Sequence, residues 1–133
     1  MALDVWIGEP ARFRGAPAVS FEPEAYYAFL YPLFEEFAQL HGQMIDPYDG
    51  AAFLSTELAP VLKLVDDAEA LIAAQPSEFE VHMGTNLGTS FDPKNEPIYH
   101  TVKRDEYLKF IGRLRAAVLQ AQRTGERLVF FGD

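Results

Sequence analysis

The sequence contains no cysteine among its 133 residues, and this absence excludes several classes of protein at once. Without thiols there is no disulfide framework, no thiolate zinc site and no cysteine nucleophile. Basic residues are also few, with 11 Lys and Arg against 20 Asp and Glu, so the net charge is −9. Such a charge opposes general attraction to phosphate backbones and anionic lipid, and direct nucleic-acid binding is therefore not expected.

Long apolar runs are missing as well. No window approaches the roughly 20 apolar residues that a membrane-spanning helix needs. The first four residues, Met1 to Asp4, lack the basic stretch and apolar run of a secretory signal. Repeats, low-complexity tracts and long Gly/Ser-rich linkers are absent too. These absences predict a soluble, cytoplasmic protein that does not bind a membrane, with residues 1–133 folded as a single globular domain.

Turn formers and apolar periodicity divide the chain into short strands and three helices. Alternation of apolar and polar residues predicts strands, whereas apolar residues three and four apart predict helices. The strands are expected near residues 3–7, 16–21, 78–83, 98–102 and 127–131, and the helices near residues 23–40, 56–75 and 105–124. This order predicts an α+β fold with a mixed or antiparallel sheet of about four to five strands, packed with three helices.

Two local features add detail to this prediction. Pro32 lies inside the apolar pattern of the first helix, where it removes a backbone donor and crowds the preceding turn. A kink or a split into two short helices is therefore expected near Tyr31. Residues 128–131 are continuously apolar, which is typical of a strand that is covered on both faces and central in its sheet.

Acidic residues are unevenly distributed along the chain. Residues 1–100 contain 16 acidic and 4 basic residues, a net charge of −12, whereas residues 101–133 contain 4 acidic and 7 basic residues, a net charge of +3. Most basic residues belong to the third helix and its flanks, where pairing with the acidic body explains them best. The acidic residues of the first two helices and the loop between them predict one strongly negative surface, which would attract a basic partner.

The density of aromatic residues between Phe21 and Phe37 is the least ordinary local feature. Seven of the 18 aromatic residues lie in these 17 positions. A helix that is apolar on so much of its circumference is either central to the core, which is the more frequent case, or covered by a partner. In the second case the rings supply affinity and the surrounding carboxylates set association rate and specificity. The candidate binding residues are Tyr27, Tyr31, Phe34, Glu35, Glu36, Asp46 and Asp49.

A second group of candidates surrounds the predicted loop at residues 84–97, and it would serve a small-ligand enzyme or sensor. These candidates are His82, Thr85, Asn86 and Tyr99. Strand parity places His82 and His100 on opposite faces, so the two imidazoles are not expected to share a metal ion. No nucleophile and base pair, metal-ligand spacing or phosphate-binding loop is complete in the sequence. Catalysis is therefore not favoured, and no catalytic residue, metal or cofactor is predicted.

Four segments are distinctive when they are taken together: residues 24–32 (EAYYAFLYP), 42–46 (GQMID), 80–85 (EVHMGT) and the ending FFGD. With them the chain resembles a family of small bacterial proteins for which no activity is established, so the resemblance implies no catalytic residue. In type, though not in motif, the chain is also similar to immunity proteins that neutralise secreted bacterial toxins. This second likeness implies a binding role.

The sequence thus favours a non-catalytic, immunity-like binding module that presents an acidic and aromatic surface to a basic protein partner, such as a toxin. Three alternatives stay open. The first is a small-ligand enzyme or sensor that uses the loop at residues 84–97. The second is a homodimer formed through the aromatic stripe. The third is an acidic inhibitor that mimics phosphate groups and blocks a nucleic-acid enzyme.

Overall fold

The computed structural model describes residues 3–9, 15–86, 88 and 95–132. Helices and strands alternate irregularly along this part of the chain, as the α+β prediction requires. In order they are β1 (Leu3–Ile7), β2 (Val19–Ser20), α1 (Ala25–His41), β3 (Ala51–Phe53), the 3-10 helix η2 (Ser55–Glu57), α2 (Ala59–Ala73), β4 (Glu78–Asn86), β5 (Glu96–Lys103), α3 (Arg104–Thr124) and β6 (Leu128–Gly132). The α+β fold with three α-helices is confirmed.

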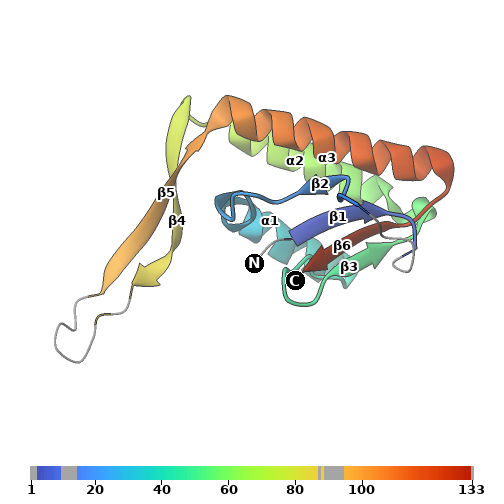
Figure 1. The fold of residues 1–133 in the computed structure, drawn as a ribbon, viewed down its shortest axis with the longest axis horizontal. Helices are drawn as coiled ribbons and strands as arrows, with labels where there is room; N and C mark the ends of the chain where they lie inside the picture. Colours follow the sequence, from blue (N-terminus) through green and yellow to red (C-terminus); the bar gives the residue numbers. More distant parts are fainter. Residues whose placement is uncertain (1–2, 10–14, 87, 89–94, 133) are drawn as a thin grey trace.

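The strands β2, β1, β6 and β3 form, in that order, an antiparallel sheet (Figure 1). Val5 lies opposite Phe130, and since directly opposed residues share a face of a sheet, both point to the same side. Both are buried, as is Leu128. β6 is therefore an interior strand, as its apolar run predicts. Its cover on the other face is incomplete, because Phe131 is 51% exposed.

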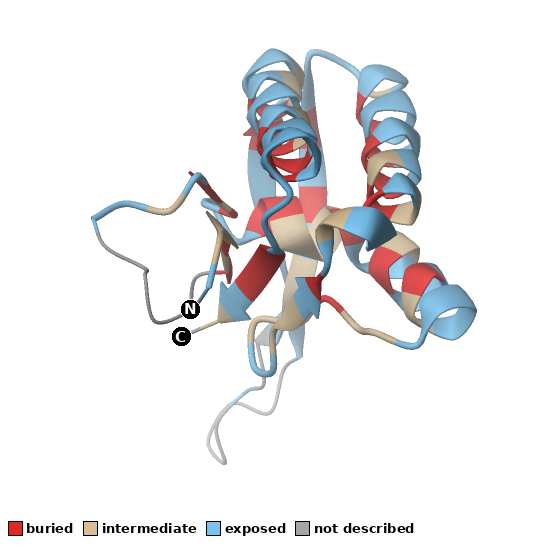
Figure 2. Cartoon of the chain, turned by 90° about the vertical axis from the view of Figure 1, so that its right-hand side faces the viewer, coloured by how far each residue is buried: buried red, intermediate tan, exposed pale blue. Residues whose placement is uncertain are grey.

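The helices close the core over the inner side of this sheet. α3 packs against β1, β2 and β6, α2 packs along α3, and α1 contacts both α2 and β4. Figure 2 shows the buried residues gathered where helices and sheet face one another. Gly42 and Gly125 end α1 and α3 in the left-handed conformation, with φ of 78° and 72°. Glycine suits these positions because it has no Cβ to clash there.

The strands β4 and β5 form a separate antiparallel hairpin, which projects from the body in Figure 1. At its base Phe79 and Val102 are buried, and the ring of Phe79 lies 5.1 Å from that of Phe29 in α1. Further out, every residue from Glu96 to Thr101 is exposed. The hairpin is termed here the β4–β5 arm. It is anchored at one end, where β4 stays in contact with the body as far as the partly buried Met83, and β5 is exposed from Glu96 to Thr101.

Several details differ from the sequence prediction. The strand expected at residues 16–21 is reduced to Val19–Ser20, and β3 was not predicted. The helix expected at residues 56–75 is divided into η2 and α2. The strands expected near 78–83 and 98–102 pair with each other rather than with the main sheet. The alternation of apolar and polar residues in these two strands indicates that one face of the pair is covered. It does not identify the covering element, which is α1.

The predicted split of the first helix is not found, because α1 runs without interruption from Ala25 to His41. Pro32 is exposed on its surface. Leu30 on one side of the proline and Phe34 on the other are both buried in the core. Packing on both sides of Pro32 therefore holds the helix together despite one missing backbone hydrogen bond. Among the described helices, none has the length and apolar character needed to cross a bilayer.

Candidate functional site

A cavity of about 330 Å³ lies where the β4–β5 arm meets the body. Its walls come from the N-terminal half of α1, the loop that follows α1, the chain before α1 and the arm. The volume lies within the range of ~300–1,000 Å³ that is usual for small-ligand sites. We term it the tyrosine cavity. Its lining includes Phe21, Glu24, Tyr27, Tyr31, Asp46, Tyr48 and Met83.

The aromatic wall of this cavity is a continuous stripe that runs along α1. Tyr27 and Tyr31 are one helical turn apart and therefore share a face, with ring centroids 6.0 Å apart in an edge-on arrangement. Phe34 continues the stripe and stacks on Tyr27 at 5.1 Å. The stripe passes from the core to the surface, since Phe34 is 3% exposed, Tyr27 is half-buried and Tyr31 is 43% exposed.

Tyr27 fastens the loop after α1 to the helix. Its hydroxyl donates a hydrogen bond to the carbonyl oxygen of Ile45 at 2.6 Å. Burial raises the pKa of Tyr27 above its ordinary value, and the nearby Asp46 carboxylate raises it further. The phenol therefore keeps its proton at neutral pH. Because the hydroxyl of Tyr27 already donates its hydrogen bond to Ile45, it does not donate one to a ligand.

The acidic wall is organised by a tight turn at residues 46–50. Asp46 accepts a hydrogen bond from the backbone N–H of Tyr48 at 2.7 Å through its carboxylate, and from Gly50 N–H at 2.8 Å through its backbone oxygen. Asp46 forms no ion pair within the part of the chain that the structure describes. The turn presents Tyr48 to solvent, with 81% of the residue exposed.

The structure brings three of the seven predicted binding residues together in the tyrosine cavity: Tyr27, Tyr31 and Asp46. Phe34 lies in the core, where a partner cannot reach it without unfolding. The other three, Glu35, Glu36 and Asp49, are exposed but do not line the cavity. The Glu35 carboxylate is close enough to the cavity to add to the raised pKa of Tyr27. Glu36 lies on a different side of α1, in a pocket that Lys63 and Asp67 of α2 also line.

Two lining residues with polar side chains, Glu24 and Tyr48, are not among the predicted binding residues. Glu24 precedes Tyr27 by three positions and Tyr31 by seven, so helical spacing alone could have placed it on the same face. No sequence signal relates Tyr48 to α1. Its position depends on how the loop folds back over the helix.

The residues predicted around the loop at 84–97 lie along the β4–β5 arm. His82 and Tyr99 are directly opposed, with ring centroids 5.3 Å apart, and Thr85 lies opposite Pro97. The side chain of Asn86 and most of the loop fall outside the described residues. None of the others lines the tyrosine cavity. His100 lies opposite Val81, on the face away from His82, as strand parity predicts.

Nothing in the described part of the chain is arranged as a metal centre, since no three His, Asp or Glu side chains converge there. Comparisons of the chain with protein-family models, with curated proteins and with solved structures found no match. The function is therefore inferred from the geometry and charge of the tyrosine cavity and its surroundings.

Proposed function

We propose that this protein is a non-catalytic, immunity-like binding module that acts in the cytoplasm and binds a basic protein partner at the tyrosine cavity. The observation that carries the proposal is the joining of exposed tyrosine rings and carboxylates at one concave site. Tyr31 and Tyr48 stand at this site with large exposed areas. Tyrosine is enriched at the centres of protein interfaces because it supplies contact area with few rotatable bonds.

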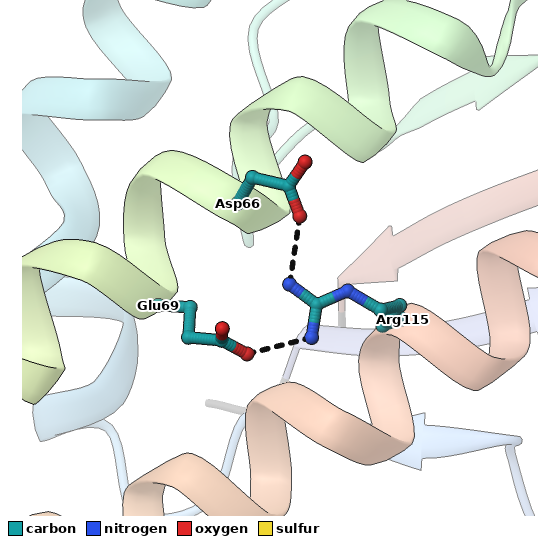
Figure 3. A network of polar contacts seen from close by, with 3 residues as sticks. All are labelled: Asp66, Glu69 and Arg115. Carbon is teal, nitrogen blue, oxygen red and sulfur yellow. Dashed lines mark hydrogen bonds and ion pairs between the residues drawn. The ribbon is translucent and has the colours of Figure 1, made fainter.

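The pairing of charges supports a basic partner. On α2, Asp66 and Glu69 are both neutralised by Arg115 of α3, at 2.8 Å and 2.6 Å (Figure 3). By contrast, four acidic residues of α1 and the following loop form no ion pair among the described residues: Glu35, Glu36, Asp46 and Asp49. Asp46 lines the tyrosine cavity and Glu35 lies close to Tyr27, so their negative charge would attract a basic surface to this site.

A capture experiment with matched variants tests the proposal. The tagged protein and a Tyr31→Ala/Tyr48→Ala variant are incubated at low salt with an extract of the cells that express the protein. Captured proteins are identified and tested again as purified proteins. We expect a basic protein that the double variant loses, and that the wild type binds more weakly as salt screens the charges. A Leu40→Ala control removes an exposed apolar residue of α1 outside the cavity and should behave as the wild type.

The opposite result is equally clear. If the wild type and the double variant capture the same proteins, or if neither captures a protein that binds again in purified form, the tyrosine cavity is not a partner site. The proposal would then be abandoned in favour of the candidate below.

A second candidate, a homodimer, is favoured by the exposed arm. Ile98 and Tyr99 are 41% and 51% exposed, and neither β4 nor β5 pairs with a further strand among the described residues. An isolated two-stranded hairpin is only marginally stable without packing on a face, so a second copy could provide the missing cover. Light scattering on the purified protein distinguishes a dimer from a monomer directly.

A further inference from the structure

We infer that the Gln43 side chain makes an autoinhibitory contact: it closes the outer edge of β3 by occupying the hydrogen-bonding positions that a strand of another molecule would use. The main sheet ends at β3 on one side (Figure 1). An open edge of a sheet is a template for pairing with another chain. The inference goes beyond the proposed function and does not depend on the tyrosine cavity.

The hydrogen bonds of Ala52 identify the free side of β3. The side-chain oxygen of Gln43 accepts a hydrogen bond from the N–H of Ala52 at 3.2 Å, and its side-chain nitrogen donates one to the Ala52 carbonyl oxygen at 2.9 Å. In an antiparallel pair, a residue directs both backbone groups either toward the partner strand or away from it. Ala52 therefore faces away from β6. The carboxamide of Gln43 has the same donor and acceptor as a peptide group, so it stands in for a neighbouring strand.

The residues two positions before and after Ala52 are also satisfied within the chain. The N–H of Leu54 donates to the Glu57 carboxylate at 2.8 Å, and the Leu54 carbonyl oxygen accepts from the N–H of Glu57 at 2.8 Å. The N–H of Gly50 donates to the carbonyl oxygen of Asp46 at 2.8 Å. Alternate residues of a strand present their backbone groups to the same edge. A strand from another molecule would therefore have to displace these contacts before it could pair with β3.

Gln43 is held beside β3 by contacts on both sides of it in the chain. Gly42 ends α1 in the left-handed conformation, and its N–H donates to the carbonyl oxygen of Ala38 at 2.8 Å. Two residues after Gln43, the carbonyl oxygen of Ile45 accepts the hydrogen bond of the Tyr27 hydroxyl. Ordering a glutamine side chain costs rotamer entropy, but here the backbone that carries it is already fixed. The contact with β3 is therefore preorganised by the fold.

Covalent capture at β3 tests the inference, because the native chain has no cysteine. Ala52→Cys places a single thiol at the exposed edge. If the β3 edges of two copies pair about this position, the two Cα atoms lie about 5.5 Å apart, which a disulfide can bridge. Under mild oxidation with diamide, we expect at least about fivefold more covalent dimer when Gln43→Ala and Glu57→Ala are added to Ala52→Cys.

Two controls isolate the contact. Glu57→Gln keeps an oxygen that can accept from Leu54, so adding it alone to Ala52→Cys should change the yield of dimer by no more than about twofold. Gln120→Cys places the thiol on the exposed side of α3, away from β3. Its yield of dimer should stay within about twofold when Gln43→Ala and Glu57→Ala are added, because the sites are distant.

Hydrogen exchange provides a second measurement that needs no association between molecules. In Gln43→Ala alone, the backbone amide of Ala52 should exchange with solvent at least about fivefold faster than in the wild type, because it then bonds only to water. The amide of Phe130 should not change, since β6 lies between β1 and β3 in the sheet. This measurement decides the inference if the variant with both alanine substitutions does not fold.

Three results would overturn the inference. They are equal yields of covalent dimer from Ala52→Cys with and without the two alanine substitutions, an equal rise in yield from Gln120→Cys, and an unchanged exchange rate of the Ala52 amide in Gln43→Ala. None of them bears on a partner that is captured at the tyrosine cavity. A dimer formed through the β4–β5 arm would be seen by light scattering with or without the substitutions, so it is distinguished from pairing at β3.

Discussion

Tyr107 shows, at the scale of single residues, how a polar atom is accommodated in the core of this protein. Its side chain is fully buried, and its hydroxyl donates a hydrogen bond to the backbone oxygen of Tyr26 in α1. The two rings stack with centroids 4.0 Å apart. Because burial disfavours the phenolate, the pKa of Tyr107 is raised above its ordinary value. The residue thus joins α3 to α1 only while it is protonated.

We predict that the free energy of unfolding falls above pH 10 and falls less steeply in Tyr107→Phe. The unfolded chain releases the phenolic proton near its ordinary pKa of 10.0, while the folded protein retains the proton to higher pH. The stabilisation is therefore complete below pH 10 and is lost as pH rises further. Urea denaturation at several pH values measures the slope. Tyr99→Phe, in the exposed arm, is the control. If the free energy of unfolding of Tyr107→Phe fell with pH as steeply as that of the wild type, the prediction would be contradicted.

Gly132 decides the position of the loop that carries Asp46 and Tyr48. A Cβ added to Gly132 would lie 1.5 Å from the carbonyl oxygen of Pro47, so the end of β6 and this loop could not keep their contact. We predict that Gly132→Ala lowers the free energy of unfolding by at least about 2 kcal/mol.

Gly112 provides the control for this substitution, measured by the same urea denaturation. It is exposed in α3, and an added Cβ meets nothing within 4 Å. Gly112→Ala should raise the free energy of unfolding by up to ~1 kcal/mol, because alanine favours the helix. Equal effects of the two substitutions would show that the close approach of Gly132 to Pro47 is not maintained in solution.

At the scale of elements, α2 and α3 are joined by an apolar contact and by one charged group at its border. Arg115 of α3 binds Asp66 and Glu69, which lie one turn apart on α2 and so present two carboxylates to one guanidinium (Figure 3). Charge patterning predicted that the basic third helix pairs with the acidic body. It could not identify these partners, which are 46 and 49 residues away.

We predict that Arg115→Gln lowers the free energy of unfolding by about 0.5–1.5 kcal/mol, since two charge-assisted hydrogen bonds are lost and two carboxylates remain close together. The difference from the wild type should shrink in 1 M salt, which screens the charges. Lys63→Gln breaks a more exposed pair with Asp67 within α2 and should have a smaller effect. An effect of Arg115→Gln no larger than that of Lys63→Gln would contradict the role of this bridge.

At the scale of the whole molecule, stability is divided between a packed body and a projecting arm. The body places α1, α2 and α3 over one face of the main sheet, and buried residues from all of them form one cluster. The arm contributes to that cluster only at its base, through residues such as Phe79, Val81 and Val102. Its outer half depends on hydrogen bonds between two strands that are open to water.

We predict that backbone amides of the arm exchange with solvent faster than those of the main sheet. Hydrogen exchange followed by NMR should show low protection for residues 98–101 and high protection for residues 128–130, because local opening of the arm exposes little apolar surface. Protection of the arm equal to that of β6 would contradict this division and would support a second copy that covers the arm. Light scattering on the same sample would then reveal the dimer.

The sequence by itself determined the local structure of this protein. Apolar spacing located the three helices, and strand parity separated His82 from His100. Gly42 and Gly125, which end two of the helices, are likewise local features. These features depend on residues that are close in the chain, so periodicity and turn chemistry are enough to predict them. The aromatic stripe and Asp46 were singled out for the same reason, as local concentrations of rings and charge.

Only the tertiary structure decided which of these features act together. Packing on both sides of Pro32 overrode its tendency to split α1, and it placed Phe34 in the core while leaving Tyr31 at the surface. Long-range contacts also neutralised Asp66 and Glu69 of α2, whereas Asp46 of the tyrosine cavity forms no ion pair among the described residues. The physical reason is that burial and pairing depend on which segments meet in space. For Tyr48, Met83 and Tyr31, no local pattern of the chain encodes that meeting.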